Sequence, residues 1–185
     1  IDPLKAVQLA KTIQHQYDVP SLGLHCDVTS EESVKAVLKK VLSKFNQVSG
    51  LINNAANNMK MQEGDPVPPT QLEMFPLETW QRDFDVAVTG AFICSRVFGK
   101  FMADKKEGVI INISSDLGII APDQRIYETS GVPEEEQIVK PVSYSVTKHA
   151  LIGLTKYLAT YWADQGIRVN TLCPGGIYSG QPDEL

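Results

Sequence analysis

Short apolar runs alternate with longer helical stretches along this sequence, and few folds accommodate that alternation. The clearest run, Gly-Val-Ile-Ile-Asn-Ile at 108–113, is rich in β-branched residues, which is typical of a buried parallel strand. The other expected strands cover 21–28, 50–55 and 167–172, and the expected helices cover 3–17, 31–45, 77–103 (with an irregularity near Gly90) and 144–164. Strands that alternate with helices predict an α/β fold with a doubly wound parallel sheet, covered by helices on both faces.

Composition narrows the class of protein. The chain has 185 residues, 43% of them hydrophobic, which is enough for one domain with a core. The net charge of −5 argues against a nucleic-acid-binding surface, and no run approaches eighteen apolar residues, so we expect no membrane span. Cys26, Cys94 and Cys173 lie far apart in apolar segments. They are expected to be reduced thiols of a cytoplasmic protein, with no disulfide and no metal site.

Tyr144 and Lys148 stand four residues apart in a helical stretch, so their side chains share one face of the helix. A free phenol has a pKa of ~10 and exchanges protons poorly at neutral pH. A neighbouring ammonium stabilises the ionised phenol, and a serine hydroxyl at Ser115 would hold a carbonyl or alcohol oxygen. The pair alone is a weak signal, but a strand, then Ser-Ser, then Tyr-x-x-x-Lys on a helix favours hydride transfer at a carbon–oxygen bond.

The motifs fall at the ends of expected strands, where ligands bind in open α/β sheets. Through them the chain resembles the short-chain dehydrogenase/reductase family over nearly all of its length. Asp27 and Val28 match the family's aspartate segment after the third strand, which meets the adenine ring. The turn from Asn53 to Ala55 matches the family's Asn-Asn-Ala-Gly turn, although Ala56 replaces the glycine.

The same resemblance implies that Ser115, Tyr144 and Lys148 are the catalytic serine, tyrosine and lysine, and that Tyr144 and Lys148 also contact the cofactor, NAD or NADP. Pro174 and Gly175 match the segment that borders the nicotinamide. The neighbouring Gly176 is expected to face the substrate.

The spacing between Ser115 and Tyr144 is about twice the family's usual one, so residues 123–140 form an insertion that includes Arg125 and Lys140. One interpretation is a solvated surface loop. The other is a lid over the substrate pocket, because long loops in compact domains are often functional. In the lid interpretation, Arg125 would suit a polar substrate that carries hydroxyl or phosphate groups.

Each motif also has a purely structural interpretation. Asp27 can cap the following turn, and Asn53 can tie neighbouring strands together through its amide. Pro174 can simply form a turn. Tyr144 can be a core aromatic, and Lys148 a solvated helix residue.

The sequence departs from the family pattern in two further ways. It lacks the glycine-rich turn that carries the cofactor pyrophosphate, the first two strands, and the last strand and helices. We therefore expect residues 1–185 to be one Rossmann-type domain truncated at both ends, and to bind dinucleotide poorly and be inactive by itself. Ala87 also stands where the family often has a catalytic asparagine.

Together these features predict an NAD(P)-dependent oxidoreductase that interconverts a secondary alcohol and a ketone on a polar, sugar-like small molecule. Residues 114–127 and 173–178 resemble the bacterial branch linked to sugar modification of flagellin and other surface glycans. The alternative is a non-catalytic cofactor-sensing or scaffold protein. The family resemblance also implies a homodimer or homotetramer built from the helices around Ala87 and Tyr144.

Overall fold

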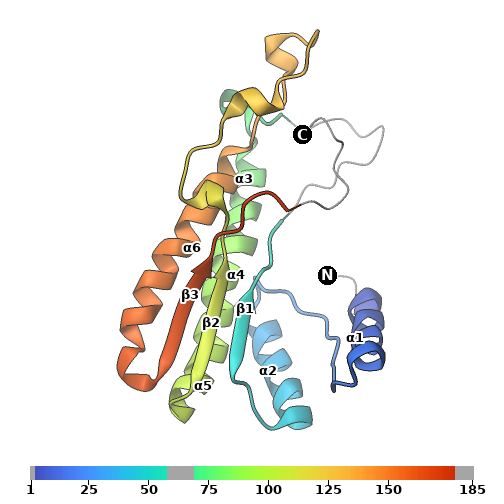
Figure 1. The fold of residues 1–185 in the computed structure, drawn as a ribbon, viewed down its shortest axis with the longest axis vertical. Coiled ribbons are helices and arrows are strands. Elements are labelled where there is room, and N and C mark those ends of the chain that lie inside the picture. Colours follow the sequence, from blue (N-terminus) through green and yellow to red (C-terminus); the bar gives the residue numbers. More distant parts are fainter. Residues whose placement is uncertain (1–2, 58–68, 178–185) are drawn as a thin grey trace.

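A three-stranded parallel sheet forms the centre of the computed structural model, which describes residues 3–57 and 69–177. Its strands lie in the order β1 (Gly50–Asn53), β2 (Gly108–Ile113) and β3 (Ile167–Leu172) (Figure 1). The register places Asn53 beside Asn112, and Asn112 beside Thr171. Because the strands are parallel, their carboxyl ends lie at one edge of the sheet.

The described residues form four main α-helical segments: α1 (Pro3–Tyr17), α2 (Glu31–Phe45), a long helix made of α3 (Leu77–Phe84), α4 (Gly90–Cys94) and α5 (Lys100–Lys105), and α6 (Val142–Tyr161). All four agree with the expected helices to within a few residues. The expected irregularity near Gly90 is confirmed, because a π-helical turn from Asp85 to Thr89 precedes that glycine. A second π-helical turn covers Ser95–Gly99.

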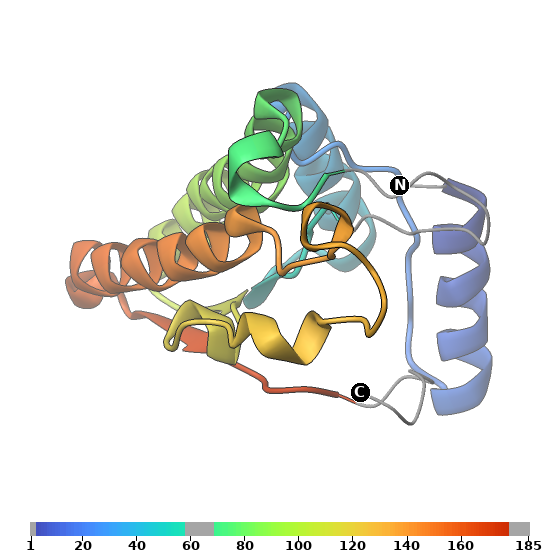
Figure 2. The same cartoon turned by 90° about the horizontal axis from the view of Figure 1, so that it is seen from above.

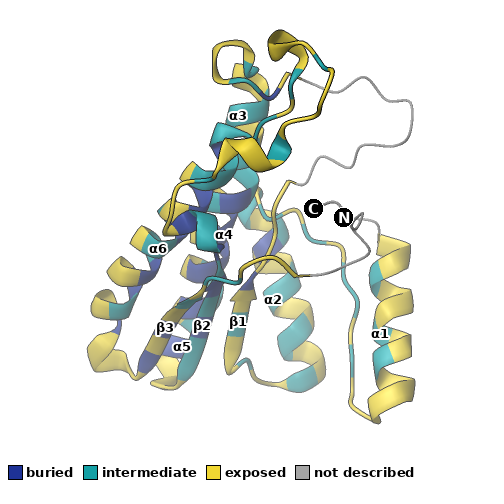
Figure 3. Cartoon of the chain, turned by 45° about the horizontal axis from the view of Figure 1, so that its top comes forward, coloured by how far each residue is buried: buried dark blue, intermediate teal, exposed yellow. Residues whose placement is uncertain are grey.

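The described helices that pack on the sheet lie on one of its faces, as Figure 2 shows, with α1 standing apart beyond α2. Strand residues that point toward the helices are buried, such as Ile110 and Val169, whereas Ile52 and Leu172 on the other face are 65% and 56% exposed (Figure 3). Among the described residues, the helices packed on the sheet therefore cover one face, and the expected parallel α/β arrangement is confirmed. Two successive right-handed crossovers that step in the same direction place their helices on the same side.

The expected strand at 21–28 is also absent, because residues 18–27 belong to no helix or strand. A strand needs a neighbour to satisfy its backbone groups, and β1 pairs only with β2 among the described residues. The end of this segment still packs, since Val28 contacts a small apolar cluster of Val34, Ile93 and Cys94.

Apolar side chains between the sheet and the helices form the main core, which contains Met102, Ile110, Leu158, Trp162 and Val169. Most of these residues come from α5, β2, β3 and α6, so the core fixes the long helix and α6 against the sheet. The long helix from Leu77 to Lys105 is apolar enough to cross a membrane by length and composition, yet 56% of its most apolar window is buried inside the protein. The long helix therefore packs against the sheet as a core helix.

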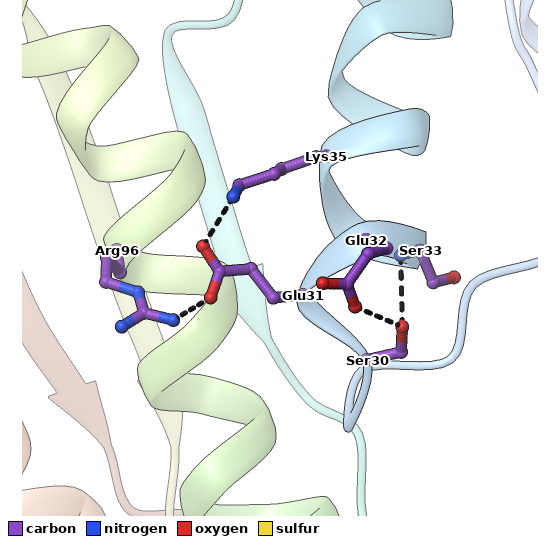
Figure 4. A network of polar contacts seen from close by, with 6 residues as sticks. All are labelled: Ser30, Glu31, Glu32, Ser33, Lys35 and Arg96. Carbon is purple, nitrogen blue, oxygen red and sulfur yellow. Dashed lines mark hydrogen bonds and ion pairs between the residues drawn. The ribbon is translucent and has the colours of Figure 1, made fainter.

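Helix α2 is held to the long helix by charged groups at its first turn (Figure 4). Ser30 caps the helix by accepting a hydrogen bond from the backbone N–H of Ser33 at 3.2 Å. Glu31 then lies between Lys35 on its own helix and Arg96 on the long helix. These ion pairs are partly exposed, so they orient α2 more than they stabilise the fold.

A chain of buried polar side chains crosses the sheet near its carboxyl edge. The amide of Asn53 donates to Asn112 Oδ1 at 2.8 Å and to Ser95 Oγ at 3.0 Å. The amide of Asn112 donates to Thr155 Oγ1 at 2.8 Å, and Thr171 Oγ1 donates to the same oxygen at 2.6 Å. All three strands are thereby joined to the long helix and to α6. Because buried polar groups are costly when unpaired, this chain favours one relative placement of those elements.

Replacing Asn112 with leucine should destabilise the intact protein by about 1–3 kcal/mol, since it leaves a buried N–H of Asn53 without an acceptor. The matched control is Gln165→Leu, which changes an exposed amide side chain in the turn between α6 and β3 and should cost at most about 0.5 kcal/mol. Urea unfolding of the two variants measures the difference. Equal unfolding midpoints would show that the polar chain does not stabilise the fold.

Candidate active site

The strand-end segments that carry the expected motifs lie side by side. The backbone N–H of Ser114 donates to the carbonyl of Leu172 at 2.8 Å, and that of Asp116 donates to the carbonyl of Pro174 at 3.0 Å. Pairing between the two chains thus continues past the ends of β2 and β3. It holds the segment around Ser115 beside the segment that begins at Pro174.

Helix α6 is locked to the end of β2 at Lys148. The Lys148 ammonium donates to the carbonyl of Ile113 at 2.9 Å, and Ser114 Oγ donates to the carbonyl of Lys148 at 2.7 Å. Lys148 is only 8% exposed, and its Nζ lies 5.6 Å from the centre of the Tyr144 ring one helical turn away. The two side chains therefore share one site, as their spacing predicts.

A cavity of about 230 Å³ contains this pair. It opens between the long helix, the end of β1, the start of α6 and the insertion, so segments distant in sequence meet there. Its walls are formed by Ala56, Asn57, Thr70, Asp83, Ala87, Tyr127, Ile138, Val139, Lys140, Pro141, Ser143, Tyr144, Thr147 and Lys148. Ala87 is one of these residues, so the position where the family often has an asparagine faces the same cavity.

Ser115 is buried at the end of β2 but does not line that cavity. Its hydroxyl donates to Asp116 Oδ1 at 2.7 Å and accepts from the backbone N–H of Leu117 at 3.2 Å. The hydrogen bond from Ser115 is the main reason that the pKa of Asp116 is lowered. The serine hydroxyl would have to leave Asp116 before it could donate to a substrate oxygen.

Three of the residues expected to bind the cofactor, Asp27, Val28 and Asn53, make contacts within the fold. The carboxylate of Asp27 caps a turn by accepting from the backbone N–H and hydroxyl of Thr29 at 2.9 and 2.7 Å, and these bonds lower its pKa. Val28 packs so closely on Gly90 that a Cβ there would lie 2.7 Å from its methyl group. Asn53 belongs to the buried polar chain.

Ala55 and the segment 174–176, also expected to contact the cofactor or the substrate, lie at the carboxyl edge of the sheet and are mostly exposed. Ala55, Gly175 and Gly176 are exposed, and Pro174 is partly buried. Small side chains on this edge, together with the nearby Lys148 ammonium, fit the nicotinamide and ribose end of a dinucleotide. The described residues contain no group of three or more histidine, cysteine, aspartate or glutamate side chains that could hold a metal ion.

The insertion forms part of the cavity wall, although Arg125 does not. The side chain of Arg125 is 82% exposed and forms an ion pair with Asp123 at 2.6 Å. The end of the insertion is hydrogen-bonded to the segment before the long helix, because the backbone N–H of Val139 donates to Thr70 Oγ1 at 2.9 Å. It also carries Lys140 to the cavity.

Two charged cavity residues, Lys140 and Asp83, had no role in the sequence-based prediction. Asp83 Oδ1 accepts from Asn57 at 2.9 Å, and its Oδ2 accepts from the hydroxyl of Ser143. Local spacing indicates neither residue, since Lys140 lies before the start of α6 and both reach the cavity through tertiary packing.

Both lysines of the cavity have pKa values below that of a free lysine. Burial is the main cause for Lys148, and the positive charge of Lys140 adds to it. Burial also lowers the pKa of Lys140, which the nearby Asp116 carboxylate partly offsets. Each ammonium therefore loses its proton at lower pH than an exposed lysine would.

Replacing Lys140 with glutamine should raise the pKa of Lys148, because it removes the neighbouring positive charge. Heteronuclear NMR of labelled lysine side chains measures both titrations, and Lys148→Gln identifies the Lys148 signal. The titration of Lys148 should begin at higher pH in the Lys140→Gln variant than in the parent protein. A shift to lower pH would contradict the proposed coupling between the two ammonium groups.

Comparisons with known proteins agree with this geometry. A family model for short chain dehydrogenases matches residues 2–184. A 3-oxoacyl-[acyl-carrier-protein] reductase from Synechocystis sp. is 30% identical over 89% of this chain and 57% of its own length. Glucose 1-dehydrogenase 2 from Bacillus subtilis is 31% identical over 95% of this chain and 59% of its own length.

Among solved structures, ElxO with bound NADP superposes with a TM-score of 0.69 at 28% identity, covering 94% of this chain and 61% of the other. The chain thus spans somewhat over half the length of the curated relatives that it matches. The family match over nearly all residues, the parallel sheet and the paired tyrosine and lysine lead to one assignment. The chain belongs to the short-chain dehydrogenase family.

Proposed function

We propose that the protein is an NAD(P)-dependent oxidoreductase that interconverts a secondary alcohol and a ketone on a small polar substrate. The observation that carries this proposal is the joint placement of Tyr144 and the buried Lys148 ammonium in one cavity at the carboxyl edge of the sheet. Open α/β sheets bind ligands at that edge. The NADP bound to ElxO supports the choice of cofactor class.

The side chains of the cavity divide the work of the reaction. In oxidation, ionised Tyr144 takes the proton of the substrate hydroxyl while the carbon gives up its hydrogen as a hydride, and the carbon–oxygen double bond forms. A nicotinamide held beside Tyr144 and Lys148 would supply the hydride acceptor in oxidation and the hydride donor in reduction. Lys148 stabilises the ionised phenol, and Ser115 holds the substrate oxygen after releasing Asp116.

A sugar-like substrate fits the cavity better than a long acyl chain or a steroid. Relatives named for acyl and for sugar substrates match this chain at similar identity, so the comparisons do not distinguish the two substrate classes. The choice between them rests on the residues that line the cavity. Its volume of about 230 Å³ lies below the ~300–1,000 Å³ of typical drug-sized ligand sites. Asp83, Lys140 and Thr70 add polar groups to the wall. The resemblance of 114–127 to the branch that modifies surface-glycan sugars points the same way.

A non-catalytic sensing or scaffold role is the second candidate function. Ala87 favours it, because this alanine faces the cavity where an asparagine often holds a water of the proton relay in the family. The methyl group can make no such hydrogen bond. The presence of Tyr144 and Lys148 in the same cavity weighs more heavily for catalysis.

We also propose a homodimer or homotetramer in the cytoplasm, with a small-molecule substrate and with neither nucleic acid nor membrane as a partner. Two apolar residues of α6, Leu151 and Leu158, are buried in the core of the chain, being 3% and 6% exposed. Outward-facing residues of the long helix and of α6, such as Phe92 and Tyr157, are more accessible for an interface.

Tyr144→Phe should reduce turnover of the intact protein by about 10²–10⁴-fold, the usual contribution of a general acid or base. Its affinity for NADH or NADPH should stay close to that of the parent protein. The matched control is Tyr161→Phe, which removes an exposed phenol from the end of the same helix and should leave turnover unchanged. Following nicotinamide absorbance with sugar alcohols and their ketones measures the rates. Retention of most of the rate by Tyr144→Phe would refute the assigned role of Tyr144.

A further inference from the structure

Lys140 places a positive charge in the cavity that the proposed reaction does not use. Its Nζ lies 3.9 Å from the centre of the Tyr144 ring, over the face of the phenol. Within 3–57 and 69–177, this ammonium forms no hydrogen bond and no ion pair. A cation over an aromatic face is stabilised only partly, so three strong N–H donors remain available to a ligand.

The insertion holds Lys140 at this place through its backbone. Lys140 N–H donates to the side-chain oxygen of Gln124 at 2.8 Å, and the preceding residue is bonded to Thr70. Asp116 is a nearby carboxylate that favours the charged lysine, but its Oδ1 already accepts from Ser115 and Leu117. A partly buried ammonium without a hydrogen-bond acceptor gains most when an anion enters the cavity.

Asp83 supplies the complementary group. Its two oxygens accept from Asn57 and Ser143, and an ionised carboxylate has about four acceptor positions. Two of those positions remain for hydroxyl donors in the cavity, which Asp83 also lines. The cavity therefore offers a cation for an anionic group and a carboxylate for hydroxyl groups.

We propose that Lys140 binds a carboxylate or phosphate of the substrate while Asp83 accepts hydrogen bonds from its hydroxyl groups. The substrate class is then an anionic polyol or sugar, such as a sugar acid or a sugar phosphate. This inference rests on the proposed function, because it names the substrate of the same cavity. Lys140 is a specificity residue in this account, and Tyr144 remains the acid–base group.

Calorimetric binding to the intact protein with bound cofactor tests the proposal without requiring turnover. The probes are D-sorbitol, D-gluconate and D-sorbitol 6-phosphate, which share a polyol chain and differ in charge. At least one of the two anions should bind more tightly than D-sorbitol, and Lys140→Gln should weaken that anion about tenfold or more. The same variant should leave D-sorbitol binding unchanged. Comparison of the two anions distinguishes a carboxylate site from a phosphate site.

Three further variants test whether anion binding depends on net charge, on the charge at position 140, or on Asp83. Lys156→Gln removes an exposed lysine from α6, alters net charge equally, and should not change anion binding. Lys140→Arg keeps the charge and should keep the preference for the anion. Asp83→Asn should weaken all three polyols alike, because it weakens acceptance from hydroxyl groups. Unfolding midpoints equal to that of the parent protein show that each variant is folded.

Several results would overturn the proposal: no measurable binding of either anion, equal loss of all three probes in Lys140→Gln, or an equal effect of Lys156→Gln. A fall in turnover on neutral and anionic substrates alike, with KM unchanged, would show that Lys140 acts on Tyr144 instead. Failure of the proposed function would give a different combination of binding and turnover results. In that case the anions bind through Lys140, but no nicotinamide-dependent turnover occurs with any substrate.

Discussion

The hydrogen bond between the buried amides of Asn53 and Asn112 is the contact on which the placement of the site depends. It joins β1 to β2 one residue before the end of β2, and Asn112 continues the chain to Thr155 on α6. The segments that leave these elements carry the cavity residues, so the relative position of Tyr144 follows from this buried contact. A shift of register would leave buried amide groups unpaired, and that cost favours a single arrangement.

The burial of Lys148 beside the end of β2 determines the chemistry of the cavity. Lys148 is taken out of water and bonded to the carbonyl of Ile113, which ties its charge to the end of β2 and keeps it beside Tyr144. The insertion then closes the cavity from another side and adds Lys140. Burial lowers the pKa of both ammonium groups, and the charge of Lys140 lowers that of Lys148 further, so the cavity suits anionic oxygen groups, whether on the substrate or on the ionised phenol.

Much of this structure could be predicted from local sequence, and the failures have physical reasons. Strands β2 and β3 and helix α6 were placed to within a few residues because β-branched runs and helical periodicity are local signals. Residues 21–28 have an equally strand-like pattern, but a strand also requires a neighbouring strand to pair with, and the described residues provide none for this segment. The pairing of Tyr144 with Lys148 needed only helical spacing, whereas Asp83 and Lys140 reach the cavity through tertiary packing of the long helix and the insertion.

The central claim is that the cavity at the carboxyl edge serves a nicotinamide cofactor beside Tyr144 and Lys148. The most direct measurement is a fluorescence titration of the intact protein against NADH and NADPH, with Lys148→Gln measured alongside. The account predicts saturable binding of at least one cofactor and weaker binding by the variant. Absence of binding to both cofactors would contradict it and favour a non-catalytic role for this fold.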